Sequence, residues 1–308
     1  MKILGIGNAI VDVICKVEDN FLKNNHLTKS TMKLVTESEF RNLLSLLKID
    51  NTVSGGSVAN SIVGLSQLGN DVGFIGKISD DELGMKYENG LKNEKVKFFF
   101  SKKKEKLPTG TCLILVTPDS ERTMCTFLGT AGKINEKDVS IEAVTDSTIV
   151  FLEGYLWDEG DPKKAFDKAI NHANKVAMSL SDQFCVDRHK THFLELVKNK
   201  LDIIFSNENE IKSLIEAKNF DEVISFSKEI KKHLIITRGE KGAISINNGR
   251  IFEIEAKKNI KIVDLTGAGD LFAAGYLHGY INQFSPQRCL EKGTEMSTKV
   301  IQKMGARI

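Results

Sequence analysis

The sequence predicts an α/β fold of three layers, in which helices cover both faces of a mostly parallel central sheet and a small β-sheet forms a lid. Two observations lead to this prediction. After Gly132, short β-branched strands alternate with helical patterns, which is typical of a parallel sheet. Between Val96 and Phe127 no helical pattern occurs, and strand-like segments follow one another across turn residues, which indicates a separate small sheet.

The elements before residue 96 begin with a buried strand. Ile3–Gly7 is an apolar run of the kind found in central strands, and residues 7–13 continue it outward. Apolar spacing and the stop at Gly69 predict the helix 58–68. The other elements predicted here are strands at 32–36 and 72–76 and a helix from Asp80 to about Asn93.

The small sheet is predicted from three strands, at 98–100, 111–117 and 123–127, with turn signals at Pro108 and Pro118. A two-stranded unit is marginal alone, so the lid needs further strands or a partner's sheet. We therefore expect one domain over 1–308 with a discontinuous lid, roughly 12–37 and 97–130. The protein is expected to be a monomer or a homodimer joined through the exposed lid edges.

The second half supplies the alternating elements. Apolar β-branched segments predict strands at 148–153, 176–180, 203–206, 234–237 and 260–263. Helical patterns are present at 162–175, 189–199, 208–217, 220–231, after Asp270 and at 286–303. Residues 243–246 and 250–254 are predicted to pair as a hairpin across Asn247-Asn248-Gly249.

Composition excludes several classes of function. The net charge is +2 and charged residues make up 27% of the chain, so nothing favours binding to nucleic acid or to an acidic membrane. No apolar run approaches the ~20 residues of a membrane span. The five cysteines are odd in number and include no C-x-x-C pair. We expect reduced thiols, no metal framework and a cytoplasmic protein.

Asp264-Leu265-Thr266-Gly267-Ala268-Gly269-Asp270 lies between a predicted strand and an apolar helix. The first N–H groups of a helix and its dipole bind anions, and the glycines allow close approach. A carboxylate beside an anion repels it unless the carboxylate accepts a proton from the attacking group, which is the role of a general base in phosphoryl transfer. The alternative is that Asp270 only caps the helix. The segment is neither a Walker A loop nor a dinucleotide fingerprint.

Two N-terminal segments indicate a ligand site. Gly55-Gly56-Ser57 precedes a helix, and Asn60 lies one turn into it, so bare backbone and an amide face the same end. Asp12 follows apolar and small residues, where a buried carboxylate needs partners. Its two oxygens suit two neighbouring hydroxyls. The alternatives are a capped loop for the first segment and a structural ion pair for Asp12.

Two further loops follow predicted strands at the end where α/β sheets bind ligands. Asn207-Glu208-Asn209-Glu210 follows the strand 203–206, and a plain helix cap is its alternative interpretation. Thr237-Arg238-Gly239-Glu240-Lys241-Gly242 follows the strand 234–237, and a plain turn is its alternative. Arg122 is expected to be an exposed hairpin residue, with contact to a phosphate on lid closure as the other interpretation.

These segments together resemble the PfkB family, the ribokinase-like sugar and nucleoside kinases. Asp12, Gly55–Asn60, Asn207–Glu210, Thr237–Gly242 and Asp264–Asp270 stand in the family's order over nearly the whole chain, although Leu265 departs from the usual Thr. Segments at 182–185 and 305–307 resemble the adenosine kinase branch. The resemblance implies a ribokinase-like fold and the use of ATP and Mg²⁺, and it leaves a monovalent cation open.

The resemblance also implies roles for individual residues. Asp270 is the base, and Gly267, Ala268 and Gly269 form an anion hole. The acceptor is bound by Asp12, Gly55, Gly56, Ser57 and Asn60. Asn207, Thr237, Gly239 and Gly242 lie beside ATP, and Glu210 holds Mg²⁺ through water.

The function we expect is transfer of the γ-phosphoryl group of ATP to a sugar hydroxyl, foremost the ribose 5′-hydroxyl of adenosine. A ribokinase- or fructokinase-like carbohydrate kinase is the first alternative. A catalytically silent nucleoside- or sugar-binding sensor is the second, but binding alone needs no base.

Overall fold

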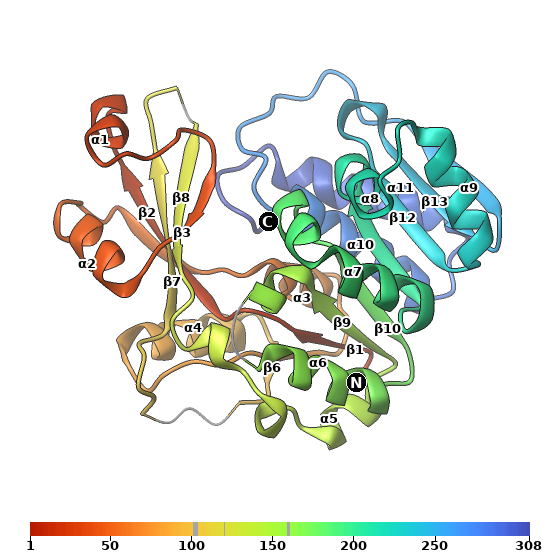
Figure 1. The fold of residues 1–308 in the computed structure, drawn as a ribbon, viewed down its shortest axis with the longest axis horizontal. Helices are drawn as coiled ribbons and strands as arrows, with labels where there is room; N and C mark the ends of the chain where they lie inside the picture. Colours follow the sequence, from red (N-terminus) through yellow and green to blue (C-terminus); the bar gives the residue numbers. More distant parts are fainter. Residues whose placement is uncertain (101–103, 120, 159–160) are drawn as a thin grey trace.

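The computed structural model describes residues 1–308 except 101–103, 120 and 159–160 (Figure 1). Within these residues the larger of two sheets has nine strands, and only its β12–β13 and β13–β14 pairs are antiparallel. In spatial order its strands are β14 (Arg250–Ile254), β13 (Ala243–Asn247), β12 (His233–Thr237), β11 (Ile203–Asn207), β10 (Val176–Ser179), β9 (Ile149–Glu153), β1 (Ile3–Ile6), β5 (Val72–Ile75) and β6 (Lys97–Phe98).

Helices pack on both faces of this sheet, and each face has its own hydrophobic core. The first core includes side chains of α3 (Ser57–Gln67), α4 (Glu82–Asn93), α10 (Ala268–Ile281) and α11 (Pro286–Val300). The second includes those of α5 (Ile141–Thr145), α6 (Pro162–His172), α7 (Gln183–Asn199), α8 (Glu208–Ile215) and α9 (Phe220–Ile230). The three-layer fold with a mostly parallel sheet is therefore confirmed.

The smaller sheet has five strands within the described part of the chain and stands beside the larger body (Figure 1). In spatial order they are β3 (Met32–Leu34), β8 (Arg122–Phe127), β7 (Gly110–Val116), β2 (Ile10–Lys16) and β4 (Asn51–Ser54). One face packs with α1 (Asp19–Asn24) and α2 (Glu37–Ser45) into a core of its own, which includes Phe40 and Leu113. Since helices of the same chain cover that face, a lid-to-lid dimer would have to use the edge strands β3 and β4.

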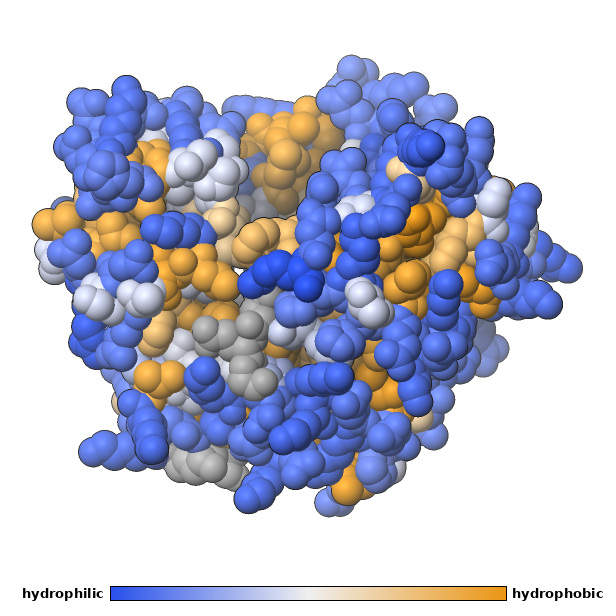
Figure 2. Space-filling model, viewed as in Figure 1, coloured by the Kyte–Doolittle hydropathy of each residue, from blue (hydrophilic) through white to orange (hydrophobic). Residues whose placement is uncertain are grey.

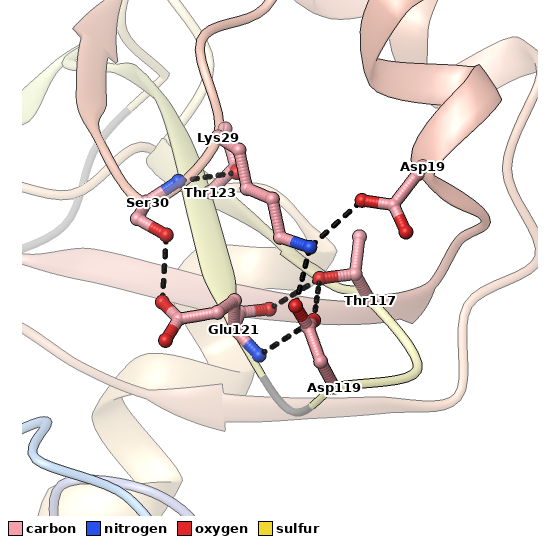
Figure 3. Close-up of polar contacts among 7 residues, drawn as sticks. All are labelled: Asp19, Lys29, Ser30, Thr117, Asp119, Glu121 and Thr123. Atoms are coloured by element: carbon pink, nitrogen blue, oxygen red, sulfur yellow. Dashed lines mark hydrogen bonds and ion pairs between the residues drawn. The ribbon is translucent and has the colours of Figure 1, made fainter.

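A cluster of polar contacts ties the far end of the smaller sheet together (Figure 3). The ammonium of Lys29 lies 2.7 Å from Asp19 Oδ1 and 2.5 Å from Asp119 Oδ2. Asp19 belongs to α1 and Asp119 to the turn between β7 and β8, so one lysine joins the helix to the hairpin. Both acids are about half exposed, and exposed pairs contribute little each, roughly 0–1 kcal/mol.

The structure corrects three details of the sequence prediction. Residues 260–263 form no strand; the N–H groups of Val263 and Asp264 donate to the carbonyl of Ile301, just past α11, instead of to a neighbouring strand. β6 pairs with β5 in the larger sheet and not in the lid. The smaller sheet also contains β4, and α1 and α2 cover it; these elements are short and were not predicted.

None of the helices in the described ranges has the length and apolar character that crossing a membrane requires.

Candidate functional site

A cavity of about 570 Å³ lies between the two sheets. Its floor is formed at the carboxyl ends of strands of the larger sheet, the position where open α/β sheets bind ligands. The face shown in Figure 2 is hollowed between the smaller sheet and the body, with hydrophobic atoms inside the hollow. The lining includes eleven of the predicted site residues: Asp12, Gly56, Ser57, Asn60, Asn207, Glu210, Thr237, Gly267, Ala268, Gly269 and Asp270.

Asp270 lies in the first turn of α10 and is held by side chains of α3. Ser57 Oγ donates to Asp270 Oδ1 at 2.7 Å, and Asn60 Nδ2 donates to Asp270 Oδ2 at 3.0 Å. Burial raises the pKa of Asp270 to about 6, while these two hydrogen bonds act in the opposite direction. Each oxygen keeps a second lone pair, so an ionised Asp270 can still accept a proton from a ligand.

The loop before Asp270 has the backbone shape of an anion site. Gly267 caps α10 in the left-handed conformation, with φ of 77°, which favours glycine. The first-turn N–H groups of a helix have no partners within the helix, and the helix dipole makes this end positive. Gly269 has open space where a Cβ would stand, so a ligand can approach the backbone closely.

Asp12 of β2 has no hydrogen-bond partner for its carboxylate among the described residues, although burial raises its pKa to about 7. It lines the cavity, so the unused oxygens face the ligand space. Gly55 does not line the cavity; a Cβ there would lie 2.3 Å from Asp12 Oδ2. Gly55 therefore makes room for the Asp12 carboxylate.

Asn207 and Glu210 form a capping box at the start of α8, which was the alternative interpretation of this segment. The Asn207 side chain accepts from the N–H of Glu210, and Glu210 Oε2 accepts from the N–H of Asn207, each at 2.9 Å. Glu210 is 4% exposed and still lines the cavity, and burial raises its pKa to about 7.

The residues present fit a magnesium ion that keeps its water shell. The described part of the chain contains no group of three or more His, Cys, Asp or Glu side chains placed to hold a metal ion directly. Each Glu210 oxygen accepts one hydrogen bond and retains a lone pair for a bound water. Mg²⁺ usually binds proteins through one or two carboxylates, waters and substrate phosphates.

The loop after β12 is only partly at the cavity. Thr237 lines it, whereas Gly239 and Gly242 do not. Gly242, with φ of 86°, faces the next strand, since a Cβ there would collide with the carbonyl oxygen of Ile254. Its conformation is explained by the hairpin.

The structure adds site residues that sequence reasoning missed. Glu153 ends β9, lines the cavity and accepts from the N–H groups of Asn8 and Val58, at 2.8 and 2.9 Å. Burial raises its pKa to about 7. Asp12 was identified as a carboxylate that follows apolar and small residues. Glu153 follows the apolar residues of β9 in the same way, so this signal would also have identified Glu153. Arg307 follows α11 and donates to Asn60 Oδ1 at 3.0 Å; it lies in the segment 305–307 that resembles the adenosine kinase branch, but no role was predicted for it.

Arg122 is also at the site, contrary to the expectation of an exposed hairpin residue. Its side chain is 9% exposed, and Nη2 lies 2.6 Å from Asp264 Oδ2. Nε and Nη1 are buried without partners in the described residues. The smaller sheet thus contacts the loop that begins at Asp264.

A model described as pfkB family carbohydrate kinase matches residues 3–308. The chain belongs to this family. An adenosine kinase structure from Sinorhizobium meliloti is 35% identical with a TM-score of 0.93, covering 100% of this chain and 95% of that one. A probable sugar kinase structure from Rhizobium etli CFN 42 is 34% identical with a TM-score of 0.92, covering 99% and 94%. Adenosine kinase 2 of Arabidopsis thaliana is 23% identical, covering 98% and 94%.

Membership in the pfkB family makes the chain a phosphotransferase with an alcohol group as acceptor. The fold is ribokinase-like, as the resemblance implied. Kinases of this family act on small molecules, and membership in the family implies the use of ATP. The cavity between the sheets is thus the candidate active site.

Proposed function

We propose that this pfkB-family kinase phosphorylates the ribose 5′-hydroxyl of adenosine or a closely related nucleoside. The observation that favours a nucleoside is the apolar wall that the smaller sheet and its neighbouring loops present to the cavity. The wall consists of Ile10, Met32, Leu34, Cys112, Met124 and Leu128.

This wall suits a flat base better than a bare sugar. Methionine and leucine adapt to an aromatic face, and methionine sulfur makes favourable contacts with rings. A hexose, with hydroxyls around its ring, would leave polar groups unpaired against such a surface. Asp12 lies on β2 beside Ile10, so a ribose held by Asp12 would place its base along the wall. The likeness to the Sinorhizobium adenosine kinase supports the same choice.

The chemistry follows from the groups around Asp270. A pKa of about 6 leaves this carboxylate mostly ionised at neutral pH and close to the value that suits a general base. Asp270 accepts the proton of the acceptor hydroxyl as that oxygen bonds to the γ-phosphorus of ATP, and the bond from the γ-phosphorus to the bridging oxygen breaks so that ADP leaves. The N–H groups at the start of α10 bind the transferred phosphoryl oxygens. When bound near Glu210, Mg²⁺ would neutralise charge on the phosphates.

The lid keeps water away from the γ-phosphate, which otherwise competes with the acceptor. We propose that the smaller sheet, with lid boundaries near 12–37 and 97–130, closes over the acceptor. The ion pair between Arg122 and Asp264 connects β8 to the start of the loop 264–270, which supports this proposal.

The test is ADP release with a panel of acceptors: adenosine, inosine, ribose and fructose at equal subsaturating concentrations. Adenosine is expected to give the highest kcat/KM. The variant Met124→Glu, which places a charge in the apolar wall, should lower kcat/KM for adenosine more than for ribose. A higher kcat/KM for fructose or ribose would support the carbohydrate kinase alternative, and no ADP release with any acceptor would support the silent sensor.

A further inference from the structure

Arg307 lies behind the proposed base and reaches it through a single side chain. Its Nε donates to Asn60 Oδ1 at 3.0 Å, and Asn60 Nδ2 donates to Asp270 Oδ2 at 3.0 Å. Arg307 does not line the cavity, so it has no direct contact with ligand space. The three side chains form a chain of hydrogen bonds from the segment after α11 to the first turn of α10.

The direction of this chain is fixed by chemistry. A guanidinium can only donate hydrogen bonds, so the atom of Asn60 that faces Arg307 has to be the amide oxygen. The amide nitrogen then faces Asp270, where it donates to the carboxylate. Without Arg307, the Asn60 amide could turn over, and its oxygen would face the Asp270 carboxylate as a second acceptor.

The segment that carries Arg307 is itself held in place. The N–H of Gly305 donates to Asp264 Oδ2 at 2.6 Å. Ala306 packs against Gly267, because a Cβ on that glycine would lie 2.7 to 2.8 Å from Ala306 atoms. Arg307 is half-buried as a residue, and its Nη2 atom is buried without a partner among the described residues. The contacts of Gly305 with Asp264 and of Ala306 with Gly267 thus fix the backbone beside Arg307, so that its guanidinium lies next to Asn60.

The charges around Asp270 come from several elements. Asp12 on β2 and Glu153 on β9 are the neighbouring acids, and both have pKa values raised to about 7 by burial. Arg307 is the cation that acts on Asp270 and, together with Arg122 on β8, on Asp12. Helix α3 contributes uncharged donors to the same carboxylate. Loss of Arg307 would therefore remove a positive charge from a site that holds three neighbouring carboxylates.

We propose that Arg307 is a positioning residue for phosphoryl transfer, which orients the Asn60 amide so that it donates to Asp270 and keeps that carboxylate ionised. The proposal rests on the proposed function in assigning Asp270 as the base. It makes the segment after α11 part of the active site, although no described residue of that segment lines the cavity.

The first test is the pH profile of kcat/KM for whichever acceptor the wild type phosphorylates best. Activity needs ionised Asp270, so a higher pKa moves the acid limb to higher pH. Arg307→Met should move that limb upward by about one pH unit. At pH values below the limb, kcat/KM should therefore fall roughly tenfold, and at alkaline pH it should recover. Arg307→Lys should recover most of the loss, because the charge and a donor remain. Arg250→Met, at an exposed arginine on β14, is the matched control.

The second test measures the carboxyl itself and needs no substrate. ¹³C NMR of aspartate-labelled protein, with the Asp270 signal assigned from Asp270→Asn, should show a higher Asp270 pKa in Arg307→Met than in wild type. If the methionine variant does not fold, Arg307→Gln is measured instead. This result is independent of the acceptor, so it separates failure of this inference from failure of the proposed function.

A double substitution tests the route through Asn60. In an Asn60→Leu background, Arg307→Met should move the Asp270 pKa by much less than it does in the wild type, because contacting residues are coupled. An equal shift in both backgrounds would show that Arg307 acts by charge alone and not by positioning Asn60. An unchanged Asp270 pKa in Arg307→Met, or in Arg307→Gln where that variant replaces it, would overturn the proposal. A loss of activity that is the same at every pH would also overturn it.

Discussion

The two ends of the cavity are built differently. At the proposed acceptor end, Asp12, Asn60 and Asp270 come from segments far apart in the sequence. The side chains of Asn60 and Asp270 hydrogen-bond to residues of other elements. At the proposed nucleotide end, Asn207 and Thr237 end neighbouring strands of one sheet. The Asn207 side chain hydrogen-bonds to its capping partner, Glu210.

This difference predicts how large the effects of substitutions are at each end of the cavity and whether they are additive. At the acceptor end a substitution alters a shared network of buried carboxylates and donors, so effects should be large and non-additive. At the nucleotide end Asn207 and Glu210 bond to each other within one helix turn, so effects should be smaller and confined to one ligand.

The largest effect is expected for Asp270→Asn, which keeps the shape of the base and removes its basicity. Turnover should fall by roughly 10²–10⁴ while acceptor and ATP binding are largely kept. Steady-state kinetics with calorimetric binding measures both, and Asp167→Asn, at an exposed aspartate on α6, is the control. Turnover within a few-fold of wild type would contradict the assignment of the base.

Asp12→Ala should have the next largest effect, on acceptor affinity. Loss of charge-assisted hydrogen bonds to two hydroxyls should weaken acceptor binding by roughly 2–4 kcal/mol and leave ATP binding nearly unchanged. Calorimetry with adenosine and its 2′- and 3′-deoxy analogues is the measurement. The analogues should bind the wild type more weakly and lose little further affinity in the variant. If each deoxy analogue loses as much affinity in the variant as in the wild type, Asp12 has a purely structural role.

Glu210→Gln should act at the other end and on the metal. The Mg²⁺ concentration for half-maximal activity should rise roughly tenfold, which is the low end of the loss in metal affinity when a group that holds a metal through another ligand is replaced. Acceptor affinity should be unchanged. Glu208→Gln is the control, since Glu208 lies in the same helix turn and pairs with Lys212 and Arg238. An identical Mg²⁺ titration would leave Glu210 as a helix cap only.

The smallest effect is a change in mobility. Hydrogen exchange in β2, β7 and β8 should slow when the acceptor binds, because the lid closes over the acceptor end, and should change less with ATP alone. Equal exchange in free and acceptor-bound protein would argue against a closing lid.

The same contrast explains how much could be predicted from sequence. The strand–helix alternation and the motifs that follow strand ends depend on local patterns, so the larger sheet and eleven cavity-lining residues were predictable. The contact of Ser57 with Asp270 spans 213 positions, and only tertiary packing creates it. Arg122 cannot be told from an exposed hairpin arginine in the sequence, because its ion pair with Asp264 forms only when the smaller sheet packs beside that loop. Gly55 and Gly242 were expected near ligands, but the structure packs them against Asp12 and Ile254.

The separate core of the smaller sheet has a consequence for its chemical reactivity. All five cysteines are buried; Cys15 and Cys125 lie in that core, while Cys185 and Cys289 lie in the two cores of the larger body. Burial raises the pKa of both Cys125 and Cys289 to about 11, so neither thiol reacts until its surroundings open. Opening of the smaller sheet alone would expose its thiols first, so the order in which an alkylating reagent modifies these cysteines records which part of the molecule unfolds locally.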